Sequence, residues 1–487
     1  MLLDVSTVTT IIREVSADLE TPVSLYLKLR GDGASFLLES VEGGERIARY
    51  SFIGVQPRAE YILRDGQVEV KENGETRIVQ LDGTDPTIFL QNEMNRFPAV
   101  RLPNAPRFTG GLVGYLGYES VRFFESTLSK KMNRAHTSTG ISASIPDGIY
   151  LLADTIVAFD HARRTIFLIA NVLDGDMQAA EGKLDSIAAR IHHPLPAVQK
   201  INVTPSKVKA NHTQGTYEDM VRAAKEHIAA GDIFQVVLSQ RFSRETNVEP
   251  FDVYRAVRRL NPSPYMFFFD FGLVDDEPLY LVGSSPEMFV RLDGRTASLR
   301  PIAGTRPRGA DAAADALLAK DLLADPKERA EHVMLVDLGR NDLGRVCEYG
   351  TIKVSDFFTV EKYSHVMHIV SHVEGTLRPE LTAFDLVRAA FPAGTVSGAP
   401  KVRAMEIIAE LESDVRNAYA GMIGYFGFDG AMDTCLAIRT MVGRGNTVSV
   451  QAGAGIVADS DPSTEFQETV NKASAMLRAI DAAENQG

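Results

Sequence analysis

YAGMIGYFGFDGAMDTCLAIRTMVGRGNTVSVQAGAGIV, residues 419–457, is the stretch that decides the fold of this chain. Its β-branched and aromatic runs are interrupted at Asp429-Gly430 and at GRGN (443–446), sequences typical of tight turns between antiparallel strands. We therefore predict three strands joined by two hairpin turns. Sheets dominated by hairpins, without regular strand-helix-strand alternation, indicate the α+β class.

The same kind of pattern extends toward the N-terminus. Short strand-like runs separated by Gly, Asn and Asp turns fill residues 23–172, which predicts mostly antiparallel strands there. Residues 176–191 are helix-like and lead into a polar, proline-bearing connector. From Thr216, a helix that ends at Gly231 precedes a strand. We divide the chain into a β-rich N-terminal region (1–175), a helix and connector (176–215) and an α+β region (216–487).

Composition excludes several classes of protein. The 51 Lys and Arg residues against 64 Asp and Glu residues give 51 − 64 = −13, which disfavours nucleic acid or an anionic membrane as a partner. Only Cys347 and Cys435 occur, too few for a disulfide framework, so we expect a cytoplasmic protein. We find no apolar run long enough to span a bilayer and no basic start of a signal peptide.

Two acidic pairs with the same spacing are candidates for a metal site: Glu328 with Glu331, and Glu465 with Glu468. Each follows an Asp-Pro, at 325–326 and 461–462, that predicts a helix N-cap and first helical residue. Both carboxylates of a pair then lie on one face of the opening turns. Two such helices could hold a Mg²⁺ ion, which takes oxygen ligands and usually needs only one or two protein carboxylates beside an anionic substrate.

Each pair also has a purely structural interpretation. Glu328 could complete a capping box with Asp325, and Glu468 could form a solvated pair with Lys472. On the last helix, Glu465, Glu468 and Lys472 form one polar stripe. A separate apolar stripe contains Phe466, Val470, Ala473 and Leu477, so the polar stripe could face a site while the apolar one fills core.

An anion site is also indicated near the end of the quoted stretch. Gly453, Gly455 and Ala458 match the dinucleotide pattern G-x-G-x-x-A, but the run sits in or at the end of a strand, which argues against a nucleotide. Such small residues let backbone N–H groups approach a carboxylate. By period-two counting, Arg439 shares a strand face with Asp433, so it either binds a substrate carboxylate or forms an internal salt bridge.

The order of these motifs resembles a known family. The motifs are LLES (37–40), RYSFIG (49–54), NPSPYMFF (261–268), GSSPE (283–287), RPIAGTRPRG (300–309), DPKERAEHVMLVDLGRND (325–342), YSHVMHIVS (363–371), FPAGTVSGAPK (391–401), IRT (438–440), QAGAGIV (451–457) and EFQETVNKA (465–473). They are similar to those of the chorismate-utilising enzymes, most closely the large subunit of anthranilate synthase (component I). The resemblance covers nearly the whole chain and implies an α/β/β/α sandwich with large antiparallel sheets and flanking helices.

The resemblance also implies a reaction and its residues. Chorismate and ammonia would give anthranilate and pyruvate with Mg²⁺, the first step of tryptophan biosynthesis. The implied catalytic residues are Glu287, His368, Thr395 and Lys472, and the implied substrate-binding residues are Gly304, Thr305, Tyr419, Arg439, Gly453, Ala454 and Gly455. The implied metal ligands are Glu331 and Glu468 most directly, supported by Glu328 and Glu465 directly or through water. Glu287 would need a raised pKa to act as an acid at neutral pH.

Some of these residues have bland alternatives. A lone histidine in an apolar strand is more often a satisfied core residue, and His365 is a weaker candidate than His368. We interpret Arg306 and Arg308, beside the Gly304-Thr305 turn, as surface charge.

Two positions distinguish relatives within the family. Isochorismate and salicylate synthases carry a water-activating lysine where this chain has Gln235, and aminodeoxychorismate synthase typically has a lysine where it has Ala303. Both favour anthranilate synthase. The alternatives are aminodeoxychorismate synthase component I and an inactive tryptophan-sensing homologue. Neither cysteine lies in a glutaminase-type elbow, so the resemblance implies a glutamine amidotransferase partner (component II), in a heterotetramer of two large and two small subunits.

A regulatory site is implied in the N-terminal region. LLES and NPSPYMFF resemble a pocket for L-tryptophan as feedback inhibitor, formed by Glu39, Ser40, Pro264, Tyr265 and Met266. An indole needs a flat apolar slot, and its ammonium needs a carboxylate or carbonyl nearby. Packing of these residues as plain core is the alternative.

Overall fold

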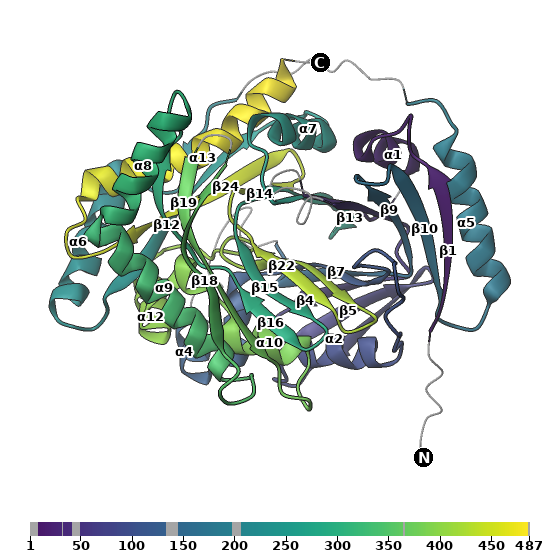
Figure 1. The fold of residues 1–487 in the computed structure, drawn as a ribbon, viewed down its shortest axis with the longest axis horizontal. Coiled ribbons are helices and arrows are strands. Elements are labelled where there is room, and N and C mark those ends of the chain that lie inside the picture. Colours follow the sequence, from purple (N-terminus) through teal and green to yellow (C-terminus); the bar gives the residue numbers. More distant parts are fainter. Residues whose placement is uncertain are drawn as a thin grey trace.

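Two large antiparallel sheets face each other in the computed structural model, which describes residues 8–31, 33–40, 49–132, 145–196, 206–363 and 366–485 (Figure 1). Within this part of the chain each sheet has twelve strands, and every pair between them is antiparallel. Helices cover the outer faces. The predicted α+β class and the α/β/β/α sandwich are therefore confirmed.

The first sheet places strands from both ends of the chain side by side. In spatial order it contains β1 (Thr9–Ser16), β10 (Thr165–Val172), β9 (Thr155–Asp160), β3 (Tyr50–Val55), β2 (Ser35–Glu39), β13 (Tyr265–Val274), β14 (Glu277–Ser285), β23 (Thr440–Arg444), β24 (Thr447–Ile456), β12 (Gln235–Glu245) and β11 (Lys209–Ala210), with β20 (Gly398–Ala399) paired to β12.

The second sheet is built in the same way. Its order is β17 (Ile302–Pro307), β19 (Val366–Thr376), β16 (Thr296–Leu299), β15 (Met288–Asp293), β22 (Met432–Leu436), β21 (Met422–Gly427), β7 (Gly111–Leu116), β8 (Gly148–Ala153), β4 (Ala59–Arg64), β5 (Gln67–Glu72) and β6 (Glu75–Gln80), with β18 (Lys353–Lys362) paired to β19. β2 pairs with β13, and β7 pairs with β21. Each sheet therefore combines strands that precede the predicted connector at 176–215 with strands that follow it. The three-part division of the chain stays a prediction from sequence.

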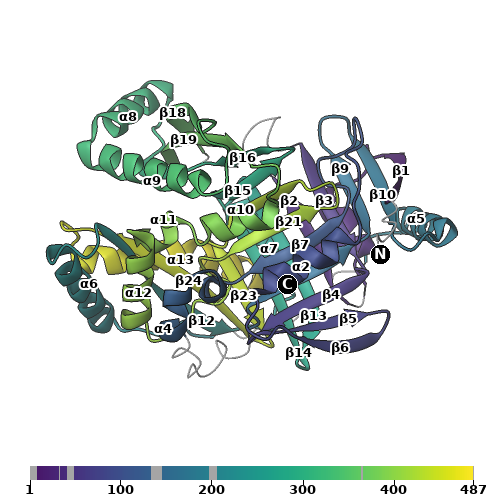
Figure 2. The same cartoon turned by 90° about the horizontal axis from the view of Figure 1, so that it is seen from below.

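The helices are α1 (Pro22–Leu29), α2 (Pro86–Asn95), α3 (Val121–Phe124), α4 (Ser126–Met132), α5 (Met177–Ile191), α6 (Gln214–Ala229), α7 (Pro250–Leu260), α8 (Ala312–Ala324), α9 (Pro326–Gly344), α10 (Ala383–Ala390), α11 (Gly394–Ser397), α12 (Lys401–Leu411) and α13 (Pro462–Glu484), with a 3₁₀ turn at Tyr118–Ser120. Helices α8 and α9 and strands β18 and β19 lie together at one end of the molecule (Figure 2). No helix of the described ranges is long and apolar enough to cross a membrane.

The quoted stretch 419–457 links the two sheets. It forms four strands and not three, because the middle run breaks between Leu436 and Thr440. The hairpin of β21 and β22 belongs to the second sheet, and the hairpin of β23 and β24 belongs to the first. Arg439 sits at the break in a left-handed conformation, with φ of 51°. Period-two counting along one continuous strand failed because a strand that changes sheets must bend.

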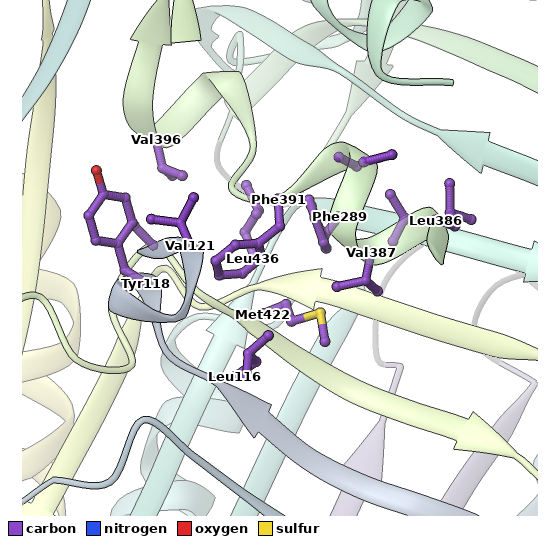
Figure 3. Close-up of a cluster of buried hydrophobic side chains, with 14 of the residues drawn as sticks. Leu116, Tyr118, Val121, Phe289, Leu386, Val387, Phe391, Val396, Met422 and Leu436 are labelled. Carbon is purple, nitrogen blue, oxygen red and sulfur yellow. The ribbon is translucent and has the colours of Figure 1, made fainter. Parts of the chain in front are cut away.

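Three of the four buried clusters in the described residues correspond to the layers. Side chains along β21 alternate between two clusters. Ile423 and Tyr425 belong to the cluster between the sheets, while Met422 and Phe426 belong to the cluster on the opposite face. That opposite face packs against α2, α10 and α12, and Figure 3 shows part of this cluster around Phe289, Phe391 and Leu436. The outer face of the first sheet packs against α1, α5, α7 and α13.

Both Asp-Pro helix starts are confirmed. The side chain of Asp325 accepts hydrogen bonds from the backbone N–H groups of Lys327 and Glu328, and Asp461 accepts one from Thr464. Pro326 and Pro462 occupy the first helical positions of α9 and α13. Both helices therefore begin with a fixed orientation, which sets the direction of the acidic residues in their first two turns.

Candidate active site

One cavity of about 600 Å³ contains most of the predicted site residues. It lies between the first turns of α9 and α13 and is also lined by β12, β17, β19 and β24. Its lining includes Glu287, Gly304, Thr305, Glu328, Glu331, His368, Thr395, Tyr419, Arg439, Gly453, Gly455, Glu465, Glu468 and Lys472. Ala454 turns its side chain into the core, so only its backbone is available to this face of β24. His365 lies outside the residues that the structure describes.

The four glutamates of the two helices face this cavity, but each already has a protein partner. Glu328 contacts Arg306 at 3.2 Å, Glu468 contacts Lys472 at 2.5 Å, and Glu331 accepts a hydrogen bond from the Gln235 amide at 3.2 Å. Burial raises the pKa of Glu465, and the nearby Glu468 adds to the shift. The i,i+4 pair anticipated for Glu468 therefore forms, and it forms at the cavity.

The donor set suits Mg²⁺, although no group of three acidic, histidine or cysteine side chains in the described ranges is arranged to hold a metal. All four donors are carboxylates, the ligands that this hard cation prefers, and it needs only one or two of them when water and an anionic substrate complete its shell. Among the residues that the structure describes, the side-chain partner of Glu331 is a neutral amide, so its charge is not cancelled by a direct cationic contact.

Arg439 is a cation that faces the cavity without an anionic partner. In the part of the chain that the structure describes, its guanidinium makes no ion pair or side-chain hydrogen bond, and burial lowers its pKa. Asp433, the internal partner considered from sequence, contacts Arg291 at 2.8 Å and Arg107 at 3.3 Å instead. The salt-bridge alternative is therefore wrong, and a partly buried arginine of this kind is suited to an anionic ligand.

Glu287 has the properties of a proton donor. Its carboxyl group is buried at the cavity wall, and burial raises its pKa to about 7, against the opposing effects of the Thr395 hydroxyl, Arg439 and Lys472. A carboxylic acid with this pKa retains a substantial protonated fraction at neutral pH.

His368 is oriented by the neighbouring strand. Its Nδ1 lies 2.8 Å from the Gly304 carbonyl oxygen and 3.1 Å from the Thr305 hydroxyl. A carbonyl only accepts, so we assign the ring proton to Nδ1, which leaves Nε2 as a base. Burial lowers the pKa of His368, which favours the neutral ring at pH 7. The residue is partly buried at the cavity and is not a satisfied core histidine.

The small residues of β24 make room for two polar side chains. A Cβ atom on Gly453 would lie 2.6 Å from the Tyr419 hydroxyl, and one on Gly455 would lie 2.7 Å from the Gln235 amide. The Gly453 carbonyl also accepts a hydrogen bond of 3.0 Å from Lys472. The run is part of a strand, as predicted, and its glycines allow side chains from β12 and the 419 turn to approach the cavity wall.

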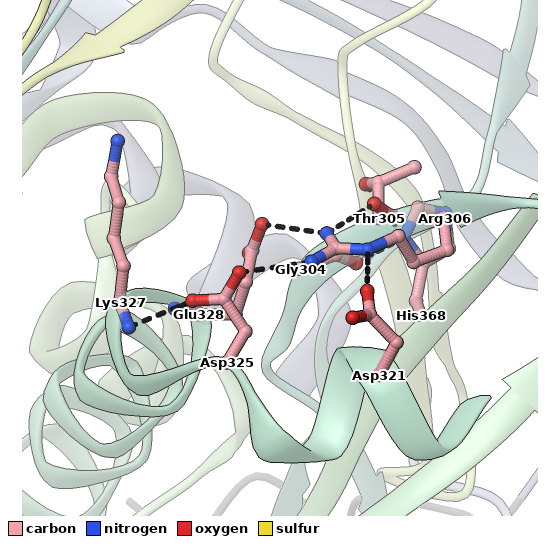
Figure 4. A network of polar contacts seen from close by, with 8 residues as sticks. All are labelled: Gly304, Thr305, Arg306, Asp321, Asp325, Lys327, Glu328 and His368. Carbon is pink, nitrogen blue, oxygen red and sulfur yellow. Dashed lines mark hydrogen bonds and ion pairs between the residues drawn. The ribbon is translucent and has the colours of Figure 1, made fainter. Parts of the chain in front are cut away.

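Sequence reasoning missed the role of Arg306. We interpreted it as surface charge, but its side chain is mostly buried and contacts Asp321, Asp325 and Glu328 (Figure 4). Only its position directly after Thr305 could have indicated this, because the three carboxylates belong to another segment of the chain.

A second, smaller pocket of about 70 Å³ is lined by all five residues predicted to be regulatory. It lies between the sheets and is also lined by aromatic side chains of β3 and β21 and by Arg107, Arg291 and Asp433. Glu39 is already neutralised: it contacts Arg258 at 2.9 Å and accepts a hydrogen bond of 2.5 Å from Tyr254. The Ser40 hydroxyl is buried without a hydrogen-bond partner in the described part of the chain. Nothing in the local sequence predicted Arg107 or Arg291.

Comparison with known proteins agrees with this geometry. The sequence profile of chorismate binding enzymes matches residues 33–478. The chain belongs to this family. Anthranilate synthase component 1 of Neisseria meningitidis serogroup A is 46% identical to this chorismate-binding chain, with 96% of this chain and 94% of the relative covered. The protein of the same name from Pseudomonas putida is 44% identical, with 97% and 95% covered.

Solved structures agree with the fold. The crystal structure of anthranilate synthase component I from Streptococcus pneumoniae has a TM-score of 0.77 at 36% identity, covering 95% of this chain and 98% of that one. The isochorismate synthase MenF of Escherichia coli has a TM-score of 0.71 at 19% identity, covering 97% and 95%, and shares the fold. The chain is therefore an enzyme of the chorismate-binding family, and the relatives named here that are 36% to 46% identical to it over nearly their full length are anthranilate synthase component 1 proteins.

Proposed function

We propose that this chain is the large subunit of anthranilate synthase and converts chorismate and ammonia to anthranilate and pyruvate, the first step of tryptophan biosynthesis. The observation that carries the proposal is that one cavity joins an unpaired arginine, a buried acid with a pKa of about 7 and a neutral histidine to the acidic turns of two helices. A dianionic substrate requires cationic contacts, and a departing hydroxyl requires a proton donor.

Different residues of the cavity would bind the substrate, donate a proton and assist the elimination. Arg439, with Tyr419 and the backbone of Gly453–Gly455, would bind a substrate carboxylate. Glu287 would give its proton to the C4 hydroxyl, which leaves as water while ammonia forms the new bond at C2. His368 would then act at Nε2 in the step that eliminates pyruvate and makes the ring aromatic.

Magnesium would be held by Glu331 and Glu468, with Glu328 and Glu465 in support. When bound, Mg²⁺ would fix the ring carboxylate and stabilise negative charge as the bonds shift. Occupation of Glu468 would require Lys472 to leave that carboxylate, and the Gly453 carbonyl, which already accepts from Lys472, offers it a second contact.

Ammonia needs no activating base at Gln235. An amide there neither removes a proton from water nor attacks the ring, and the hydrophobic Ala303 in the same cavity has no nucleophile. We propose that the ammonia comes from glutamine through an amidotransferase (component II), in a cytoplasmic heterotetramer of two large and two small subunits. The two buried, free cysteines are compatible with a reducing compartment.

We also propose that the second pocket binds L-tryptophan as an inhibitor. Its wall of Tyr265 and the aromatic side chains of β3 and β21 is suited to an indole, whereas the Met266 side chain packs in the cluster on the outer face of the first sheet. Because Arg258 and Tyr254 occupy the carboxylate of Glu39, the unpartnered Ser40 hydroxyl and backbone carbonyls are the better candidates for the ammonium.

The strands provide a short connection between the two sites. Met266 pairs with Ser284, whose backbone N–H donates to the carbonyl of Arg439 at 3.1 Å. Tyr265 pairs with Ser285, two residues before Glu287. A ligand that shifts β13 would therefore act on both an anion-binding residue and the proton donor, which is coupling between sites and not competition.

One assay tests the reaction. The purified chain is incubated with chorismate, Mg²⁺ and ammonium, and anthranilate is followed by its fluorescence. We expect anthranilate with ammonium alone, without glutamine, and no isochorismate when ammonium is withheld. Formation of aminodeoxychorismate would favour that synthase instead, and absence of any product would favour a sensor that has kept only the fold.

A further inference from the structure

Arg306 lies between the Gly304-Thr305 turn, here called the substrate turn, and the acidic residues in the cap and first turn of α9. Its Nε lies 2.8 Å from Asp321, its Nη2 lies 2.9 Å from Asp325, and its Nη1 lies 3.2 Å from Glu328. The same Nη1 donates to the carbonyl oxygen of Thr305 at 3.1 Å. One guanidinium therefore joins β17 to the end of α8 and to the cap and first turn of α9 (Figure 4).

The two glutamates of α9 have different surroundings as a result. Glu328 contacts Arg306 with one carboxylate oxygen, and its other oxygen packs against Gly304, where a Cβ atom would approach it to 3.0 Å. Glu331 faces the same cavity, but it accepts its hydrogen bond from the neutral amide of Gln235. Burial raises the pKa of Glu328, and Arg306 opposes this shift.

We infer that Arg306 is a positioning residue that gives the two glutamates different roles: it holds Glu328 against the substrate turn and leaves Glu331 as the α9 carboxylate available to a cation. This inference rests on the proposed magnesium site. Without Arg306, two neighbouring carboxylates would compete for one cation, which would bind more tightly but away from the position that serves the substrate.

The contact also reaches the catalytic histidine. The Gly304 carbonyl accepts from His368, and Gly304 has a φ of 67°, a conformation that few other residues adopt. Glu328, which is held by Arg306, packs against this turn at Gly304. Loss of Arg306 should therefore lower kcat in addition to changing cation binding.

The test compares Arg306→Gln with Arg308→Gln. Arg308 lies two residues away and binds a carboxylate of its own, Asp315 at 2.7 Å, but does not line the cavity. Binding of Mn²⁺ to the substrate-free chain is measured by electron paramagnetic resonance, and kcat and KM are measured with ammonium. We expect Arg306→Gln to bind Mn²⁺ roughly three- to tenfold more tightly and to lose roughly tenfold or more in kcat, since an adjacent positive charge is removed. Arg308→Gln should change neither.

A double variant distinguishes a change in which carboxylate binds the cation from a general loss of structure. Adding Glu328→Gln to Arg306→Gln should abolish the gain in Mn²⁺ binding, because the competing carboxylate is gone. If Arg306→Gln is poorly folded, Arg306→Lys keeps the charge with fewer contacts and should give a smaller change in the same direction. Weaker or unchanged Mn²⁺ binding in a folded Arg306 variant would overturn the inference. Absence of Mn²⁺ binding to the unmodified chain would instead overturn the proposed metal site.

Discussion

The catalytic cavity and the second pocket use neighbouring segments of the same strands but arrange charge in opposite ways. In the candidate active-site cavity, as far as the described residues show, Arg439 has no anionic partner and Glu331 contacts only an amide. In the second pocket Asp433 contacts two arginines and Tyr265, and Glu39 contacts Arg258. Charges left available suit a site that binds ions and moves protons, whereas charges that cancel one another fix the shape of a site that only binds.

The difference predicts where substitutions act. Changes in the cavity should affect turnover strongly, because we propose that its groups contact the substrate, bind the metal or transfer a proton. Changes in the second pocket should affect the inhibitor and leave turnover nearly unaltered.

Replacement of Glu287 by Gln should have the largest effect. The amide keeps the shape but cannot donate a carboxyl proton, so we expect kcat to fall by about 10²- to 10⁴-fold. In the unmodified chain the pKa of Glu287 is raised to about 7, so the acid form is present below that pH and is lost above it. The value of kcat/KM should therefore decline as pH rises through about 7. A profile without this decline would exclude Glu287 as the proton donor.

Glu331→Gln and Glu468→Gln should each lower turnover by about 100-fold or more, since loss even of an outer-shell partner of a metal often costs 10- to 100-fold. Excess Mg²⁺ should restore part of the activity. Glu226→Gln, on the exposed face of α6, is a matched control that should change little. Near-normal turnover of both cavity variants would exclude a metal site between the two helices.

His368→Met should slow the second step more than the first. We expect roughly a 10- to 100-fold loss of anthranilate with accumulation of the aminated intermediate, detected by chromatography, because amination does not need this base. His372→Met is the control: it lies in the same strand, contacts Glu374 at 3.5 Å and does not line the cavity. Unreacted chorismate without the intermediate would indicate that His368 acts earlier.

Local features of the fold and of the two sites could be predicted from the sequence. Features that depend on contacts between distant segments could not. The two Asp-Pro caps are local signals, so the starts of α9 and α13 were predicted correctly, whereas the shared strand face of Asp433 and Arg439 was not. The break at Leu436–Thr440 was missed because it is set by the packing of two sheets and not by a turn motif. The partners of Asp433 and Arg306 were missed because they come from distant segments, which pattern and propensity do not report.

The smallest effect on turnover, and the sharpest test of the second pocket, is expected from Ser40→Phe. Ser40 lies at the end of β2, its hydroxyl is buried, and the pocket beside it is bounded by Tyr265 and Met266. A phenyl ring there would fill the space proposed for the indole, so the L-tryptophan concentration for half-inhibition should rise about tenfold or more, while uninhibited kcat changes less than about twofold. Ser40→Ala keeps the space and removes only the hydroxyl, so it should raise that concentration by a few-fold at most. Both values come from the ammonium-dependent assay with increasing L-tryptophan. If Ser40→Phe stays fully sensitive, the inhibitor binds elsewhere; if it loses turnover as severely as Glu331→Gln, the two sites are not separable and the contrast between them fails.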